Sequence, residues 1–378
     1  MKRLIIGSIL VVLLAVTACG PKTQTPSPLP SVTSPAAIPT VTSLPETEAL
    51  PTEILAAATD IPALVGPAAP VDYSPAVYLD DRSTPATLLY SMANAINRHE
   101  FIRAYSYWST PFDYIGLLEA FTNNYANTAN VQLNIGDILR EDAVGMTFYS
   151  SPVIFTFTNL DTTVYRLSSC FLFRLPQPAS FDEPPIDLLH ILKGGLNPVP
   201  LDISDNDAMR SACNGTDYGT YAAGNPPESH NLENLADLSP DNYIDNRSGA
   251  VEVVSSLYNA INRKEYVRAF AYWQDPTAVG SFADFAAGSA DTDQITAAFG
   301  AVLSDAGAGQ YYYQVPVTQT VKTISGITQT YVGCYTLHLA NPGMQAAMPF
   351  EPLGIINSKF ALVANDLDTS ALMERACN

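Results

Sequence analysis

Two arginine–tyrosine pairs, Arg103 with Tyr107 and Arg268 with Tyr272, are the residues whose types and spacing could bind a ligand. An arginine at the mouth of a pocket could hold an anionic group, and the tyrosine hydroxyl would add a second polar contact. The second interpretation places each arginine in a surface ion pair and each tyrosine in the core between helix and sheet. We favour this second, structural interpretation.

Signatures of the common catalytic sites are missing from the sequence. It contains no HExxH, no GxSxG, no Walker loop and no dinucleotide-binding glycine pattern. The histidines are expected to be solvated or satisfied in the core: His99, His190, His230 and His338. The acidic run 202–207 is better explained as the start of a short helix than as a calcium loop, since Asp207 stands where that loop needs glycine. We therefore predict no catalytic residue, no metal site and no cofactor.

The composition limits the classes of partner. With 37 acidic against 18 basic residues, the chain carries a formal charge of −19. Such a surface repels the phosphate backbone of nucleic acids, which excludes nucleic-acid binding. A hydrophobic content of 47%, with 10% aromatic residues, is too high for a wholly disordered chain.

The N-terminus has the pattern of an export signal. Lys2 and Arg3 precede an apolar run, residues 4–16, that is too short to span about 30 Å of hydrocarbon. Residues 16–19, Val-Thr-Ala-Cys, resemble the lipobox of bacterial lipoproteins. The resemblance implies that 1–18 is a signal peptide and that a lipid on Cys19 anchors the protein to a membrane, facing outside the cytoplasm at the cell surface or in the periplasm. The alternative is an ordinary signal followed by a chance cysteine.

Residues 19–75 form a segment of different composition. It is rich in proline, threonine and serine, and no aromatic residue occurs before Tyr73. Such a sequence cannot bury enough apolar surface to offset its conformational entropy, so we expect a disordered stalk. A spacer that crosses a cell wall and a simple disordered leader both fit this composition.

The rest of the chain is an internal repeat. Residues 94–108 match residues 259–273 with ten of fifteen positions identical, and the only two tryptophans, Trp108 and Trp273, fall in register. Upstream, Tyr-Leu-Asp-Asp-Arg-Ser at 78–83 matches Tyr-Ile-Asp-Asn-Arg-Ser at 243–248. We expect Arg82 and Arg247 to form local ion pairs at the helix entry. The predicted domains are repeat 1 at 76–213, a linker at 214–240 and repeat 2 at 241–378.

The cysteines support the duplication. Cys170 precedes Cys213 by the same interval that separates Cys334 from Cys377. Four cysteines allow three pairings, and the equal spacing favours Cys170–Cys213 and Cys334–Cys377, one bond for each repeat. The cysteines lack CxxC pairs, which argues against a metal site.

Each repeat is predicted to begin with helices and end with strands. Ser83 and Ser248 are the expected N-caps of the first helix, and further helices follow up to Phe121 or Phe285. Long strands are expected at these ranges: 146–158, 164–175, 311–323, 328–340 and 355–363. Helices followed by an antiparallel sheet make an α+β domain.

This element order, together with the motifs NAIN and RxE[FY]xRAxx[YW], resembles the NTF2-like (SnoaL-like, cystatin-like cone) superfamily. The resemblance implies two tandem domains, each with a curved antiparallel sheet that wraps around helices to form a cone. The superfamily contains enzymes and non-catalytic modules, so the fold does not settle the function.

Three functions remain open from sequence. The favoured one is a non-catalytic binding or protein-interaction module on a membrane anchor, with an unknown small ligand or an envelope protein as partner. The second is an extracytoplasmic enzyme of isomerase or hydrolase type with an NTF2-like pocket. The third is a scaffold in which the two repeats pack as a pseudo-dimer.

Overall fold

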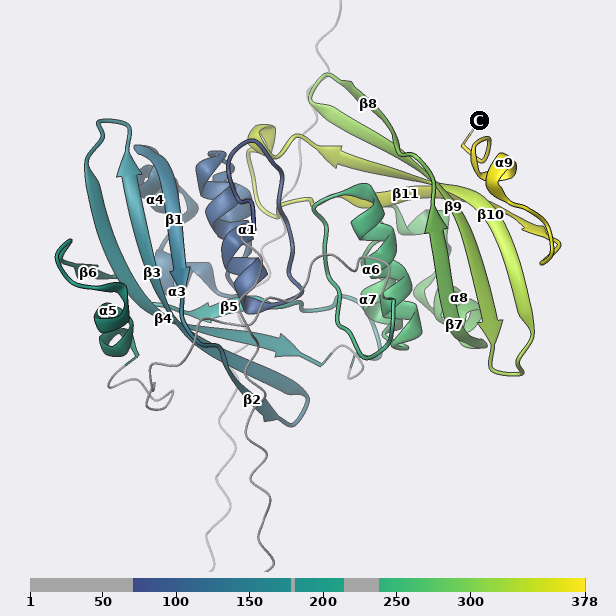
Figure 1. The fold of residues 1–378 in the computed structure, drawn as a ribbon, viewed down its shortest axis with the longest axis horizontal. Coiled ribbons are helices and arrows are strands. Elements are labelled where there is room, and N and C mark those ends of the chain that lie inside the picture. Colours follow the sequence, from purple (N-terminus) through teal and green to yellow (C-terminus); the bar gives the residue numbers. More distant parts are fainter. Residues whose placement is uncertain (1–70, 178–180, 214–237, 378) are drawn as a thin grey trace, which may run out of the picture. The chain divides into compact units, whose positions relative to one another are not determined.

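A computed structural model describes residues 71–177, 181–213 and 238–377. The predicted signal peptide, Cys19, most of the stalk and nearly all of the linker lie outside these residues. The described part of the chain is an α+β protein with two antiparallel sheets, one for each repeat (Figure 1).

Repeat 1 begins with helices and continues into strands, as predicted. Its elements are α1 (Pro85–Asn97), α2 (Phe101–Ser106), α3 (Pro111–Ile115), α4 (Leu118–Tyr125), β1 (Thr128–Ile135), β2 (Leu139–Ala143), β3 (Met146–Asn159), β4 (Val164–Pro176), β5 (His190–Lys193), β6 (Asn197–Val199) and α5 (Asp205–Ala212).

Repeat 2 follows the same order. Its elements are α6 (Ala250–Asn262), α7 (Tyr266–Phe270), η3 (Pro276–Ala278), α8 (Phe282–Ser289), β7 (Thr292–Phe299), β8 (Leu303–Gly307), β9 (Gln310–Thr323), β10 (Thr328–Ala340), η4 (Pro342–Met344), β11 (Gly354–Val363) and α9 (Ser370–Met373).

Long hairpins form the centre of both sheets. In the first sheet, β3 pairs with β4 along its whole length, from Met146 opposite Pro176 to Thr158 opposite Val164. In the second, β9 pairs with β10, and the turn at Gly326 has a φ of 85° that glycine adopts without strain. All five predicted long strands are confirmed, while the strands β1, β2, β5, β6, β7 and β8 were not predicted.

The helices that precede the strands of each repeat cover one face of its sheet, while α5 contacts β3 and β4, and α9 contacts β9 and β10. Helix α1 packs against β1, and α6 packs against β7. In repeat 1 the side of the sheet that faces the helices is filled by aromatic rings, with Phe155, Phe157 and Phe171 buried beside Trp108. Packed rings therefore occupy the space between the helices and the sheet.

The start of the first helix differs from the prediction by one residue. Thr84 caps α1 by accepting a hydrogen bond from the Thr87 amide, and Gly249 is the N-cap of α6. Ser83 and Ser248 are therefore not the caps. Their hydroxyl groups bind the backbone of the other repeat instead, which the sequence of a single repeat does not reveal.

The predicted disulfide pairing is confirmed. Cys170 is bonded to Cys213 and Cys334 to Cys377, with Cα–Cα distances of 4.9 and 5.1 Å. Each bond ties the C-terminal tail of a repeat to the central strand β4 or β10. The tail therefore stays attached to its own sheet.

Candidate functional site

A buried arginine lies at the centre of each repeat. Arg103 of α2 and Arg268 of α7 are fully buried, with 0% of their surface exposed. An arginine always carries its charge and has five N–H donors, so at this depth it needs a full set of acceptors.

The acceptors come from three places in repeat 1. The Arg103 Nε donates to Glu100 at 2.7 Å, and one terminal nitrogen donates to the Asn94 carbonyl oxygen at 2.8 Å. The other terminal nitrogen donates to the Leu79 carbonyl and, at 3.2 Å, to the Tyr107 hydroxyl. The guanidinium also lies 4.7 Å from the Tyr78 ring centroid, a cation–π contact.

Repeat 2 builds the same network. Arg268 donates to Glu265 at 2.6 Å, to Asn259 at 2.9 Å and to the Tyr272 hydroxyl at 3.2 Å. Its guanidinium lies 4.6 Å from the Tyr243 ring. Because both repeats build this network, we infer a structural role for it. It joins the helix that carries the arginine (α2 or α7) to the preceding helix (α1 or α6) and to the segment before that helix (78–83 or 243–248).

The charges in this network stabilise one another. Burial acts to lower the pKa of Arg103, but Tyr107, Tyr78 and Glu100 outweigh it and raise the pKa above its usual value. Burial raises the pKa of the Tyr107 hydroxyl, and the Asp80 carboxylate raises it further. The site therefore contains a permanent cation and a neutral phenol, neither of which titrates near neutral pH.

These contacts decide between the two interpretations of the arginine–tyrosine pairs. The four residues Arg103, Tyr107, Arg268 and Tyr272 are all 0% exposed, and both guanidinium groups are surrounded by internal acceptors. Neither arginine lies at the mouth of a pocket. The geometry supports the structural interpretation, with the correction that the ion pairs are buried rather than on the surface.

The motif residues around each arginine position other elements. The Asn97 side chain donates to the Val131 carbonyl at 3.2 Å and accepts from the Val131 amide at 2.6 Å, which fixes β1 against α1. Asn262 makes the same two contacts with Ile295 of β7. The sequence did not predict this role, although the asparagine that both repeats carry at this position was the available signal.

The matching segments 78–83 and 243–248 bring the two repeats together. We call this contact the junction. The Arg82 amide donates to the Asp245 carbonyl, and the Arg247 amide donates to the Asp80 carbonyl, both at 2.7 Å. Both repeats belong to one compact unit.

The serines beside the junction add a second reciprocal set. The Asp245 amide donates to the Ser83 hydroxyl, and the Asp80 amide donates to the Ser248 hydroxyl, both at 2.9 Å. Each repeat therefore gives and receives the same contacts, as in a two-fold symmetric dimer.

Buried ion pairs flank the junction on both sides. Arg82 Nε lies 3.3 Å from the Asp80 carboxylate, and Arg247 Nε lies 3.6 Å from Asp245. The predicted pairs at the helix entry are thus present, and they are buried. Burial acts to raise the pKa of Asp80, but Arg82, Arg103 and Arg247 of the other repeat outweigh it and lower that pKa.

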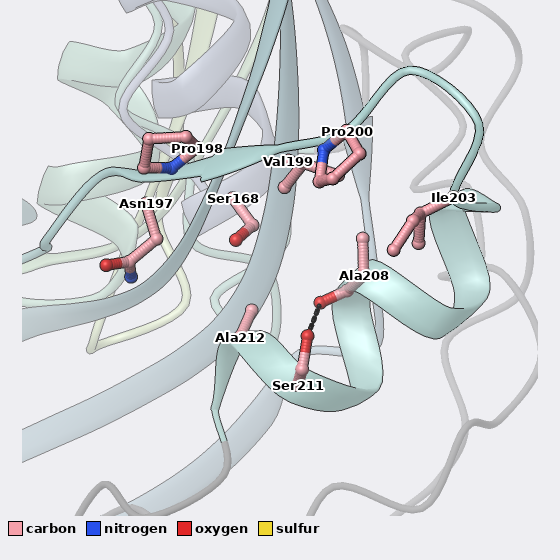
Figure 2. A pocket seen from close by; sticks show the side chains of 9 residues that line it. All are labelled: Ser168, Asn197, Pro198, Val199, Pro200, Ile203, Ala208, Ser211 and Ala212. Carbon is pink, nitrogen blue, oxygen red and sulfur yellow. Dashed lines mark hydrogen bonds between the residues drawn. The ribbon is translucent and has the colours of Figure 1, made fainter.

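A shallow pocket lies away from this network, in repeat 1 (Figure 2). Its volume is about 200 Å³, and it lies between β6, the neighbouring part of β4 and helix α5. Pockets for drug-sized ligands are usually ~300–1,000 Å³, so this hollow suits only a small group. Its lining is apolar apart from hydroxyl and amide groups: Ser168, Asn197, Pro198, Val199, Pro200, Ile203, Ala208, Ser211 and Ala212. None of the predicted ligand-binding residues lines it.

The histidines occupy separate places. His99 is exposed, as expected, at a left-handed φ of 57° between α1 and α2. His190 lies 3.1 Å from Asp187, and His338 of β10 contacts the side chains of Gln274 and Gln310. His230 lies outside the described residues. The acidic run 202–207 begins helix α5, with Ser204 as its N-cap, as predicted.

Within residues 71–177, 181–213 and 238–377, no group of three or more His, Cys, Asp or Glu side chains could hold a metal ion. None of the helices in these ranges is both long and apolar enough to span a bilayer.

Comparison with protein-family profiles, with curated proteins and with solved structures finds no match to this chain. The geometry of the junction and of the two arginine networks is therefore the basis for a functional proposal.

Proposed function

We propose that the protein is a membrane-anchored extracytoplasmic lipoprotein that acts as a non-catalytic interaction module, with its two repeats paired as a pseudo-dimer. The reciprocal junction is the observation that carries this proposal. It commits the backbone of segments 78–83 and 243–248, and both serine hydroxyls, to contacts inside the molecule.

The two arginine networks support the same proposal. The polar side chains that the repeats share around Arg103 and Arg268 have internal partners, so they join elements of the fold. A scaffold of this kind offers rigid sheets and loops to a partner, and an envelope protein is the partner class that we favour.

The location is supported by the cysteines and by the N-terminal sequence. Disulfide bonds persist in oxidising compartments, and this chain has one in each repeat. The lipobox-like residues 16–19 would place a lipid on Cys19, and the proline-rich segment would hold the repeats away from the membrane. Each repeat would be a variant of the NTF2-like cone, because helices precede the sheet and pack against one face of it.

Native mass spectrometry of the exported Cys19→Ser protein tests the proposal. We expect the mass of the polypeptide alone, lowered by the hydrogens that two disulfides remove. A stoichiometric small molecule that leaves on denaturation would contradict the proposal, and it would favour a ligand-binding or enzymatic role for the pocket in repeat 1. Mass analysis of the N-terminal peptide tests the anchor, since wild-type Cys19 should carry acyl chains and the Cys19→Ser protein should carry none.

A further inference from the structure

One pair of residues breaks the symmetry of the junction. Residues 80–83 read Asp-Asp-Arg-Ser, and residues 245–248 read Asp-Asn-Arg-Ser, so the two segments differ only at Asp81 and Asn246. These two residues face each other across the junction as an antiparallel bridge pair. Both are buried, with 2% and 7% of their surface exposed.

Each of the two side chains makes one hydrogen bond within its own segment and directs its other polar atom across the junction. The Asp81 Oδ1 accepts from the Ser83 amide, and the Asn246 Oδ1 accepts from the Ser248 amide, both at 2.9 Å. The Asn246 Nδ2 then donates to the Asp81 Oδ2 at 3.4 Å. The bond from the Ser248 amide fixes the orientation of the Asn246 side chain. Its NH₂ group, a donor, therefore meets the Asp81 carboxylate, an acceptor, across the junction.

Identical residues at this position would not match. Two aspartates would bring two acceptors and two negative charges together in a buried site. Two asparagines that each accept from the serine amide of their own segment would bring two NH₂ donors together, without an acceptor between them. Only the mixed pair satisfies both sides.

We propose that Asp81 and Asn246 determine which repeats can pair, so that the junction surface accepts the unlike repeat and rejects a like repeat from a second copy of the chain. The proposal rests on the pseudo-dimeric scaffold proposed above and names what controls its pairing. Single polar pairs buried in an interface are known to select partners in this way, at a cost in stability.

The charged surroundings support this role. The negative charges of Asp80 and Asp245 act on Asp81, while Arg82 and Arg247 are paired with those two carboxylates. From helix α1, Ser91 binds the backbone of Asp81. Burial raises the pKa of Asp81 to about 6, and Asp245 and Asp80 contribute to the increase. A second carboxylate at position 246 would therefore be rejected more strongly at neutral pH than at pH 5.

A double-mutant cycle in the intact chain tests the proposal. Asn246→Asp reproduces the contact between two copies of repeat 1, and Asp81→Asn reproduces the contact between two copies of repeat 2. The exchanged variant, with both substitutions, restores a mixed pair with the same number of carboxylates as wild type. The amides of Arg82 and Arg247 cross the junction, so their hydrogen-exchange protection reports on it directly.

We compare two products of the protection factors of these amides at pH 7.5. The product for wild type and the exchanged variant should exceed the product for the two single variants by at least about tenfold. The Asn246→Asp protein should regain protection at pH 5. A ratio near one, with additive effects, would overturn the proposal. If the Asn246→Asp chain does not fold, wild-type protection in the exchanged variant supports the proposal, and loss of protection there overturns it. Unprotected Arg82 and Arg247 amides in the wild type would instead contradict the scaffold itself.

Discussion

Arg103 and Arg268 show how a charged side chain is accommodated inside this protein. Each guanidinium meets a glutamate, an asparagine, a tyrosine hydroxyl and a backbone carbonyl, so the cost of burying the charge is offset by several charge-assisted bonds. The sequence predicted that these arginines form ion pairs. It could not predict their depth, because burial depends on how α2 packs against α1 and on the Leu79 carbonyl, which lies 24 residues away along the chain.

Arg103→Met should strongly destabilise repeat 1. The substitution keeps the apolar volume, removes the buried partner of the Leu79 carbonyl, and leaves Glu100 with only its partly exposed partner Arg98. Removal of one partner from a buried ion pair costs about 3–5 kcal/mol of unfolding free energy. Urea unfolding followed by circular dichroism measures the loss.

Arg140→Met is the matched control, since its pair with Asp142 is more than half exposed. Exposed pairs contribute about 0–1 kcal/mol, so this variant should unfold almost as wild type does. Equal losses in the two variants would show that Arg103 has no special structural role.

Asp81 should make stability depend on pH between about 4 and 6. Its pKa is raised to about 6 in the folded protein, from 3.8 for the ordinary side chain, so the folded state binds this proton more tightly. The stabilisation that protonation gives is fully present below pH 4 and is lost as the pH rises through 6. A shift of this size corresponds to about 3 kcal/mol.

Other groups also titrate in this range, so the useful quantity is the difference between wild type and Asp81→Asn. That difference in unfolding free energy should change by about 2 kcal/mol between pH 4 and pH 7, in favour of the variant at the higher pH. Parallel stability curves for the two proteins across this range would exclude the predicted titration.

At the scale of elements, the long strands were predictable and the short edge strands were not. β3 and β9 carry dense β-branched and aromatic residues, which identify strands from local sequence. β2 and β8 are exposed at every position, so they lack the alternation that marks a half-buried strand. β1 contains asparagine and glutamine, and its position depends on the side chain of Asn97 in α1.

The C-terminal helix α9 should depend on its disulfide. It has only four residues, and it contacts the sheet through β9 and β10. Replacement of Cys334 and Cys377 by alanine should cost about 2–5 kcal/mol of unfolding free energy. Hydrogen exchange should show lost protection in residues 369–377 and unchanged protection in α6.

The corresponding variant of Cys170 and Cys213 serves as the comparison for this measurement. It should loosen α5 and leave α9 protected, because each bond lies within one repeat. Lost protection in α9 after removal of the Cys170–Cys213 bond would contradict the independence of the two tails.

At the scale of the molecule, the duplication was evident from sequence, but the pairing of the repeats was only one of several possibilities. Internal similarity shows two copies of a domain and does not show which surfaces meet. The segments 78–83 and 243–248 were interpreted as helix entries, and their reciprocal hydrogen bonds become visible only when both copies are placed. The pocket in repeat 1 was also invisible, since Pro198 and Ala208 carry no chemical signature.

The most direct test of the paired repeats is an engineered disulfide between positions 81 and 246. The flanking bonds from Arg82 and Arg247 make this a non-hydrogen-bonded pair, in which Cα atoms are about 4.5 Å apart, within the range that a disulfide spans. In the Asp81→Cys, Asn246→Cys protein, we predict a third disulfide within each monomer, found by non-reduced peptide mapping beside the two native bonds. Free thiols at both positions, or bonds only between chains, would contradict the junction and the scaffold that depends on it.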